Sequence, residues 1–476
     1  GCQAERRANL GPIDATGVNL RHRKLLVRSR ARGHGTNLPH IADSDRDGVP
    51  GVDHYPPPTQ GSPLMSGSER NVTTCAARLS RVLSVALPVR DVLEQRVDEA
   101  VAPAWCDKRG WTPFLLELDE ATVRAAEANG LAELLPRLAG APQDLLELGR
   151  EVTAAVELPR LQGATPLEAE ALRSVRFRKR AQLSGLLSAV ASMAEGANRI
   201  VDVGAGSGHF TRLSAELFQR EALGLERNPA RVESAQKRAD AAAVTASFVT
   251  VDARDALQFT EQDLAIGLHA CGELGDKLVE AAARARCDLA LVSCCLQKIS
   301  SVTRKPLSQV AETPELRREH LGLTNLTAQP QGVEASIDVT IGARQTRYAL
   351  GQLLRARGLV LEPGAEMSGI NRRRANAGLA VVAQLALAQR ALPSATDAEL
   401  AHHLALAAQH YAVIRRLSLP RSMLARLIEV LVSLDRAAHL EEQGLNVQVA
   451  TLFERAVSPR NIGIFASQSG QRLPAA

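Results

Sequence analysis

Short apolar runs alternate with helical segments in the middle of this chain. Five such runs lie at residues 200–203, 223–226, 247–251, 264–268 and 288–292. Between the first two runs, His209 to Phe218 has helical spacing, and Asn228-Pro229 after the second run is typical of a helix start. Repeated alternation of strand and helix predicts a parallel sheet with helices on both faces. We therefore expect an α/β fold whose Rossmann-like sheet begins near Arg199.

The segments on either side of this region have mainly helical patterns. Residues 73–198 are predicted to be helical, with apolar residues at helical spacing from Glu168 to Glu195. Residues 300–416 break into polar loops and Ala/Leu-rich helices, which indicates an insertion. Arg421 to Glu442 is predicted to be an amphipathic helix with one apolar face, ended by Gly444.

Two strand-like runs, 446–453 and 462–465, follow that helix and predict a hairpin that completes the sheet. The expected division is a disordered tail or linker (1–72), an N-terminal helical region (73–198), a core with five strands (199–299), an insertion (300–416) and the C-terminal completion of the core (417–470).

The basic character of the chain belongs to its first residues. Residues 1–38 hold eight Lys or Arg and two acids, so a net charge of −1 is left for the rest of a chain whose total is +5. Net charge therefore gives no strong argument for a nucleic-acid partner. The carboxylates of Asp43, Asp45 and Asp47 before Gly48 resemble the start of a calcium loop. His54 stands where such a loop needs Glu, so we interpret this stretch as a solvated linker.

The number of cysteines and the length of the apolar runs indicate in which cellular compartment the protein resides. The chain has seven cysteines, an odd number with no paired framework, which favours reduced thiols and a cytoplasmic setting. No apolar run reaches the roughly 18 residues that a membrane-spanning helix needs, so we expect no membrane partner.

A glycine-rich loop follows the first predicted strand and is the strongest chemical signal. It comprises Asp202, Gly204, Ala205, Gly206 and Gly208. Glycines between a strand and a helix permit a tight turn and let a ligand approach the backbone. The dinucleotide fingerprint needs a third Gly at position 209, but this chain has His209 there. An acid followed by G-x-G-x-G is the form typical of S-adenosylmethionine-dependent methyltransferases.

Two further acids stand at the ends of the second and third predicted strands. Glu226, followed by Arg227, is placed to bind both ribose hydroxyls, because a carboxylate offers paired acceptors. Asp252, followed by Ala253, is placed to hold the adenine amino group. Together with Asp202 these acids favour S-adenosylmethionine as the cofactor. The alternative is another nucleotide-binding sheet that has acids there by coincidence.

Several further motifs carry a specific resemblance to a known family. They are Arg178-Lys179-Arg180 with Gln182, Val201 to Gly208, His269-Ala270-Cys271-Gly272, Ser293-Cys294-Cys295, Leu434-Asp435-Arg436, Glu442-Gln443-Gly444 and Ser458-Pro459-Arg460-Asn461. Over residues 170–467 the chain resembles the methyltransferase-like 25 family, whose domain is similar to that of tRNA 2′-O-ribose methylases with a His-x-Cys-Gly motif. The resemblance implies methyl transfer and leaves the acceptor open. The family usually has Glu at position 182, and an aromatic residue and His at Leu296 and Gln297.

The candidate catalytic residues are His269, Cys271, Cys294 and Cys295, at the ends of the fourth and fifth strands. RNA cytosine-5 methylases place cysteines at comparable strand ends, one of them as a nucleophile. Small buried cysteines that only pack are the plainer interpretation. A zinc site from His269, Cys271 and one of the pair matches no standard ligand spacing, so we predict no metal. Because adjacent strand residues point to opposite faces, we expect only one of Cys294 and Cys295 to face the pocket.

The only indications of the methyl acceptor in the sequence are features expected on the protein surface. The chain has two basic clusters, Arg178-Lys179-Arg180 and Arg372-Arg373-Arg374. Clusters of this kind usually form a solvated face, but they can also bind RNA phosphates. The insertion and the N-terminal region offer a broad surface, which favours an RNA or protein acceptor over a small molecule. A non-catalytic scaffold that binds S-adenosylmethionine is the alternative from another class.

Overall fold

The computed structural model describes residues 73–162, 175, 177–254, 257–326, 337–362, 364–455 and 457–475. The predicted tail, with its Asp43 to His54 pattern, lies outside these residues, as does the start of the helical stretch predicted from Glu168. The strands are β1 Arg199–Val203, β2 Glu221–Glu226, β3 Ala246–Thr250, β4 Asp263–Leu268, β5 Asp288–Val292, β6 Thr303–Arg304, β7 Leu316–Arg317, β8 Asn446–Thr451 and β9 Ile462–Ser467.

The main sheet of the described residues has seven strands in the order β3-β2-β1-β4-β5-β9-β8. Strands β1 to β5 pair in parallel, and β9 lies antiparallel between β5 and β8. This arrangement confirms the predicted α/β class, the five parallel strands and the C-terminal hairpin. The carboxyl ends of β1, β2, β4 and β5 therefore meet at one edge, where an open parallel sheet binds its ligands.

The helices of the described residues come from both halves of the chain. They are α1 Cys75–Ala86, α2 Arg90–Glu94, α3 Ala104–Lys108, α4 Thr112–Glu117, α5 Glu120–Asn129, α6 Leu131–Leu134, α7 Gln143–Ala155, α8 Phe177–Ala189, α9 Ala191–Gly196, α10 His209–Phe218, α11 Pro229–Ala241, α12 Glu273–Ala285, α13 Arg318–Leu323, α14 Ile337–Ala356, α15 Leu379–Gln389, α16 Asp397–Leu417, α17 Leu419–Met423 and α18 Ala425–Glu442. Those that pack on the main sheet include α10, α11, α12 and α18. In the described residues, no helix combines the length and the apolarity that crossing a membrane requires.

Alternate residues of β1 face two separate apolar cores, as the two-residue period of a strand requires. Val201 and Val203 join a core that contains residues of α1, α12 and α18. Ile200 joins a second core that contains residues of α8, α9, α10 and α11. Asp202 points to the same side as Ile200, where α10 meets the sheet.

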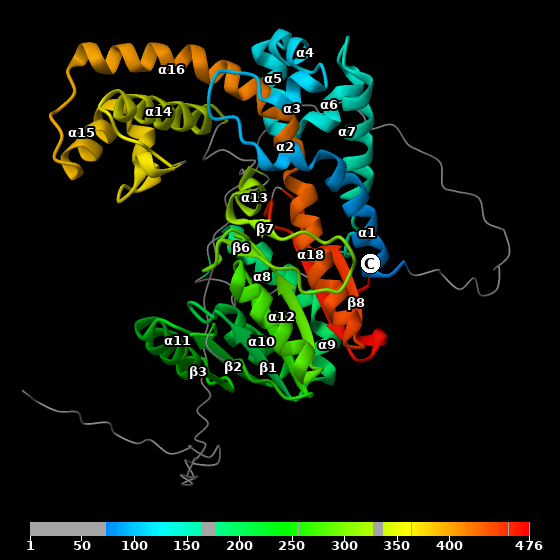
Figure 1. The fold of residues 1–476 in the computed structure, drawn as a ribbon. Coiled ribbons are helices and arrows are strands. Elements are labelled where there is room, and N and C mark those ends of the chain that lie inside the picture. Colours follow the sequence, from blue (N-terminus) through cyan, green and yellow to red (C-terminus); the bar gives the residue numbers. More distant parts are fainter. Residues whose placement is uncertain are drawn as a thin grey trace, which may run out of the picture. The chain divides into compact units, whose positions relative to one another are not determined.

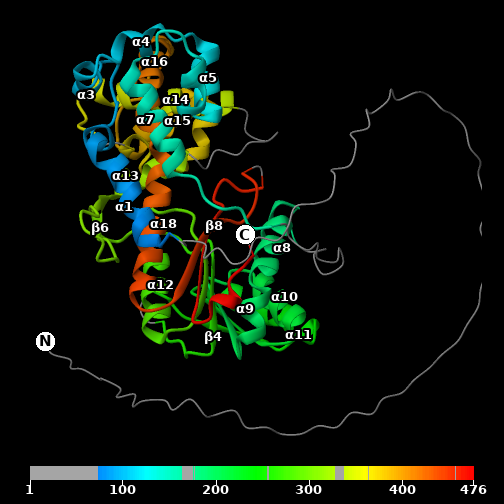
Figure 2. The same cartoon turned by 90° about the vertical axis from the view of Figure 1, so that its right-hand side faces the viewer.

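Helix α18 is buried more completely than an amphipathic pattern predicts. It packs on α1, α12, β8 and β9, and Figure 2 shows it running beside α1. Charged residues on the supposed polar face, among them Asp435 and Arg436, are fully buried. The predicted single apolar face was therefore wrong, because neighbours on several sides enclose the helix. The predicted start at Arg421 falls within the separate short helix α17.

The predicted insertion divides into two parts with different packing. Residues 303–326 pack on the main core through Leu316, Leu321 and Leu323. Helices α14 and α15 and the start of α16 have an apolar core of their own. Figure 1 shows α14 and α15 lying beside the long helix α16.

Candidate functional site

The glycine loop closes a tight turn between β1 and α10. Gly204, Gly206 and Gly208 all have positive φ, at 80°, 60° and 71°. The backbone N–H groups of Gly204 and Ala205 donate to the carbonyl of Leu225 on β2, at 2.8 and 3.0 Å. A Cβ added at Gly204 would meet nothing within 4 Å, so the outer side of the turn is open to a ligand.

Glu226 joins this loop to the end of β2. One carboxylate oxygen accepts the Gly206 N–H at 3.0 Å, and the other accepts the Asn228 N–H at 3.0 Å. The side chain is buried, at 7% exposure. Each carboxylate oxygen can accept a second hydrogen bond, so the group can also hold two ligand hydroxyls. Arg227, the next residue, is exposed.

Asp202 lies beneath the loop and is buried, with its carboxylate accepting a hydrogen bond from Thr211 Oγ1 at 2.7 Å. Burial raises the pKa of Asp202 to about 6, although the Thr211 hydroxyl and the ammonium of Lys179 act in the opposite direction. The ionised form of the Asp202 carboxyl is therefore disfavoured by burial. A hydrogen-bond donor or a positive charge placed nearby would stabilise that form.

Asp252 stands two residues beyond β3 and is half-buried. Its carboxylate pairs with the guanidinium of Arg254, with an Nη2–Oδ2 distance of 2.5 Å. This hydrogen-bonded contact with Arg254 holds the pKa of Asp252 far below its usual range. Ala253 beside it is buried. The Asp252 carboxylate already binds Arg254, so an adenine amino group could only donate to it alongside that guanidinium.

Lys179 and Gln182 of α8 also belong to the site, and they lie one helical turn apart. Burial lowers the pKa of the His209 and His269 imidazoles, and the Lys179 ammonium adds to both shifts. At Asp202 the same ammonium opposes the rise in pKa that burial causes. Burial lowers the pKa of Lys179 itself. We interpreted the cluster that contains Lys179 as a solvated face or a phosphate contact. The i, i+3 spacing, which puts both side chains on one helical face, was the available signal.

His269 follows β4 with a positive φ of 68°. Its backbone N–H donates to the carbonyl of Val292 at the end of β5, at 2.8 Å. Its Nε2 lies 3.2 Å from Gln182 Oε1. Burial lowers the pKa of His269, and the Lys179 charge adds to this effect. When the amide oxygen accepts this bond, Nε2 carries the proton and Nδ1 is the basic nitrogen of a neutral imidazole.

Three of the predicted catalytic residues form a cluster of thiols. The Sγ atoms of Cys271, Cys294 and Cys295 all lie within 4.8 Å of one another, and each side chain is half-buried. The expectation that only one of Cys294 and Cys295 faces this side was wrong. Strand β5 ends at Val292, so the strict alternation of a strand does not extend to them.

The thiols of this cluster interact with one another and with nearby main chain. Cys271 Sγ donates to the His269 carbonyl at 3.1 Å, and Cys294 Sγ lies 3.5 Å from the same oxygen. Contacts with Cys271 and then Cys294 lower the pKa of the Cys295 thiol, and Lys298 adds to the effect. Contacts with Cys271 and then Cys295 raise the pKa of the Cys294 thiol. Of these two thiols, Cys295 is therefore the one whose surroundings favour the thiolate.

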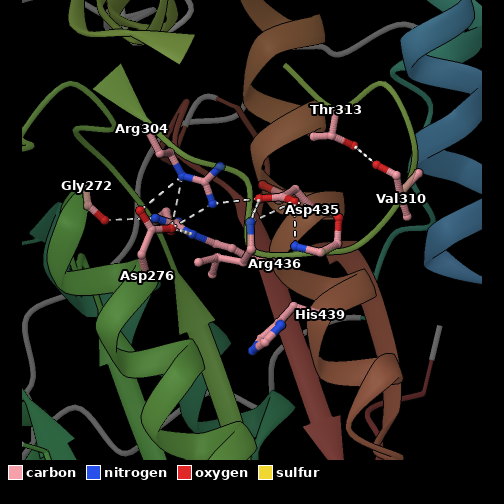
Figure 3. Close-up of polar contacts among 12 residues, drawn as sticks. Gly272, Asp276, Arg304, Val310, Thr313, Asp435, Arg436 and His439 are labelled. Atoms are coloured by element: carbon pink, nitrogen blue, oxygen red, sulfur yellow. Dashed lines mark hydrogen bonds and ion pairs between the residues drawn. The ribbon is translucent and has the colours of Figure 1, made fainter. Parts of the chain in front are cut away.

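A buried ion network from α18 fixes the two loops that carry these thiols (Figure 3). Arg436 donates to the Gly272 carbonyl at 2.8 Å and to Ser293 Oγ at 2.5 Å, and its Nε pairs with Asp276 at 2.8 Å. Arg304 joins Asp276 to Asp435, both at 2.8 Å. Burial alone would raise the pKa of Asp276, but Arg436 and Arg304 hold it below its usual value. We missed this role of Arg436, which reaches the loops only through tertiary packing.

Comparison with known proteins identifies the central region. A family described as a methyltransferase domain matches residues 178–302, which contain the glycine loop, His269 and all three clustered cysteines. The chain therefore contains a methyltransferase domain.

Solved structures that are similar to parts of this chain include three methyltransferases. The tRNA (uracil-54, C5)-methyltransferase of Pyrococcus abyssi, in complex with S-adenosyl-L-homocysteine, is 24% identical over 24% of this chain and 29% of its own, with a TM-score of 0.21. A SAM-dependent methyltransferase of Geobacter sulfurreducens, in complex with the same compound, is 19% identical over 27% and 50%, with a TM-score of 0.20. Magnesium protoporphyrin IX methyltransferase of Synechocystis PCC 6803 is 16% identical over 30% and 65%, with a TM-score of 0.22. The chain spans less than two thirds of each, and similarities of this size identify no acceptor.

Proposed function

We propose that the S-adenosylmethionine-dependent methyltransferase domain of this chain methylates RNA. The observation that carries the acceptor class is a cavity of about 670 Å³ among α5, α6, α14, α16 and α17. Eight arginines and four acids line it. The arginines are Arg96, Arg344, Arg347, Arg355, Arg372, Arg415, Arg421 and Arg455. Such an excess of guanidinium groups favours a ligand with several phosphates.

Several of these arginines are short of counter-charge. Within the part of the chain that the structure describes, no carboxylate forms an ion pair with Arg347, Arg421 or Arg455. Burial lowers the pKa of Arg421 to about 10, and burial also lowers the pKa of Arg347 and Arg455. Arg421 is buried and donates to the Leu93 carbonyl at 3.1 Å, but that neutral oxygen does not balance its charge. Arg347 is half-buried. A bound phosphate would supply the missing counter-charge to both guanidinium groups.

One further feature favours RNA over an acidic protein, and another connects the cavity with the edge of the sheet. Tyr348 and Tyr411 also line the cavity, with ring centroids 6.2 Å apart, and aromatic rings stack on unpaired bases. Gln297, two residues after Cys295, lines the same cavity. An acceptor held by the arginines would thus extend to the loop that follows β5.

The residues at the sheet edge fit S-adenosylmethionine. The open turn at Gly204 leaves room for it, Glu226 has spare acceptor capacity for ribose hydroxyls, and Asp202 gains from a nearby donor. When bound, the cofactor supplies an electrophilic methyl group. The chain's contribution is then to position the acceptor in line with that group. We assign His269 Nδ1 as the group that takes the acceptor's proton, because burial keeps the imidazole neutral.

We also propose that the chain belongs with the methyltransferase-like 25 family. The support is that the motifs behind the resemblance lie around one site, except for Glu442-Gln443-Gly444, whose Gln443 carbonyl accepts from Arg286 near the start of β5. Arg436 holds the loops of Gly272 and Ser293, and the Arg460 charge acts on Cys295. These motifs come from distant parts of the sequence, and a shared site gives a physical reason for their joint presence.

The test is transfer of labelled methyl groups from S-adenosylmethionine to fractionated RNA and protein from the source cell. We expect label in RNA that ribonuclease releases and protease does not. Label confined to protein would contradict the RNA assignment. Cofactor binding without any transfer would instead favour the scaffold alternative.

The arginine cavity gives a second test. Replacing both Arg344 and Arg347 by Ala should weaken RNA binding and reduce the salt dependence, lowering the slope of log K against log salt by about 1–2. The matched control replaces Arg137 and Arg150, which are exposed and lie outside the cavity. Equal salt slopes for the two double variants would separate RNA binding from the cavity.

A nucleophilic cysteine is the second candidate mechanism, favoured by the lowered pKa of Cys295. In that mechanism a thiolate adds to a pyrimidine ring and leaves after methylation. RNA that contains 5-fluorocytosine would then form a covalent adduct with the wild type, and the adduct would vanish in Cys295→Ser.

A further inference from the structure

The sequence alone predicts no metal here, but from the positions of the three sulfurs we propose that Cys271, Cys294 and Cys295 form a three-thiolate site for a soft divalent cation of the zinc type. All three sulfurs already lie within 4.8 Å of one another. In a tetrahedral zinc site with Zn–S bonds of about 2.3 Å, the sulfurs stand roughly 3.8 Å apart. Contraction by an ångström or less would therefore bring three thiolates to a common metal. The proposal does not depend on which acceptor is methylated.

The loops that carry the sulfurs are held in place before any metal binds. The Glu273 N–H donates to the Lys298 carbonyl at 3.0 Å, and the Lys298 N–H donates to the Cys295 carbonyl at 3.1 Å. Gly272 sits at this contact with φ of 52°, where an added Cβ would stand 2.1 Å from the Lys298 carbonyl oxygen. Arg436 binds both loops from the other side. Preorganised ligands lower the entropy lost on binding.

The surrounding charge suits a metal held by three thiolates. Three thiolates with one divalent cation leave a single negative charge. The ammonium of Lys298 and the guanidinium of Arg460 both act electrostatically on the Cys295 sulfur. These two cations would offset that remaining charge. Thiolates are the ligands that soft cations such as Zn²⁺ prefer over carboxylates.

The site would keep one coordination position open. Among the described residues, no fourth His, Cys, Asp or Glu side chain joins the group. His269, the nearest imidazole in sequence, has its Nε2 engaged with Gln182. Structural zinc sites have four protein ligands, whereas sites with three leave the fourth position to water or a substrate. We therefore infer an open site at the edge of the sheet where β4 and β5 end.

Metal binding to the full, reduced chain tests this proposal. Co²⁺ should bind in one equivalent with the near-ultraviolet absorption of cobalt–thiolate bonds, and Zn²⁺ should displace it. Cys271→Ser, Cys294→Ser and Cys295→Ser should each lower Zn²⁺ affinity at least about tenfold, since even outer-shell changes at zinc sites cost 10- to 100-fold. The matched control is Cys287→Ala, a buried thiol at the opposite end of β5, which should bind Zn²⁺ as the wild type does.

A measurement on the wild type alone guards against variants that fail to fold. Zn²⁺ should protect Cys271, Cys294 and Cys295 from alkylation, read residue by residue by mass spectrometry, and leave the other cysteines unchanged. Equal alkylation with and without Zn²⁺ would overturn the proposal, as would protection that needs no metal and is removed by a reductant. Methyl transfer to RNA that persists in metal-free protein would leave the proposed function standing, so the two proposals fail separately.

Discussion

Arg436 donates to Ser293 Oγ at 2.5 Å, although the two residues are separated by 143 positions in the sequence. The same guanidinium reaches the Gly272 carbonyl at 2.8 Å. One fully buried side chain of α18 thus connects the two loops that follow β4 and β5. The C-terminal helix thereby sets the geometry of a site whose other residues lie in the central sheet.

Removing that connection should destabilise the protein strongly. Arg436→Met leaves Asp276 and Asp435 to share Arg304, so we expect the free energy of unfolding to fall by about 3–5 kcal/mol, the usual cost of breaking a buried ion pair. Urea unfolding measures this loss. Arg90→Met removes an exposed pair with Glu94 and should change stability by no more than about 0.5 kcal/mol. An equal loss of unfolding free energy in the two variants would show that the buried network stabilises the fold no more than an exposed ion pair does.

Glu226→Ala should weaken S-adenosylmethionine binding. The variant removes the carboxylate that we propose accepts from the ribose hydroxyls, together with the bond that holds Gly206. A hydrogen bond to a charged group is worth about 1.5–3 kcal/mol. Calorimetry should therefore give a dissociation constant roughly 10- to 100-fold higher. Glu221→Ala, at the exposed start of the same strand, is the control and should bind normally. Unchanged affinity in Glu226→Ala would remove this residue from the site.

Asp202→Asn should make the protein more stable at neutral pH and bind the cofactor less well. Burial raises the pKa of Asp202 from 3.8 to about 6, so the folded state holds this proton more tightly than the unfolded chain. Its contribution favours folding below about pH 4 and is lost as the pH rises through 6. The amide avoids that loss and should gain about 1–3 kcal/mol at pH 8. Chemical denaturation from pH 5 to 8 measures the difference, which should narrow toward low pH. A difference independent of pH would contradict this account.

Gln182→Glu should move the pH dependence of methyl transfer. A carboxylate about 3 Å from His269 Nε2 favours the imidazolium, so the pKa of His269 rises. Because we assign the neutral imidazole as the base, the acid limb of the activity profile should shift to higher pH. Gln143→Glu adds the same charge on α7 and serves as the control. An unshifted profile with normal turnover would argue against His269 as the base.

The sequence by itself determined the central strands and the glycine loop. Strands β1 to β5, the glycine turn and the acids Asp202 and Glu226 were predicted because their signals are local: a short apolar run, a turn that requires positive φ, and an acid at a strand end. The C-terminal hairpin was also predicted, since strand periodicity does not depend on the neighbours of the strand.

Tertiary structure alone decided what surrounds those elements. The clustering of Cys294 and Cys295 with Cys271 depends on where β5 ends and on how the following loop turns. The burial of Arg436 depends on helices and loops far from it in sequence, which enclose a side that looks polar in isolation. The same holds for the arginine cavity, whose lining comes from the N-terminal helices, the insertion and the C-terminal part. Periodicity reports which face of an element is apolar, but the partner that covers each face is set by packing between distant segments.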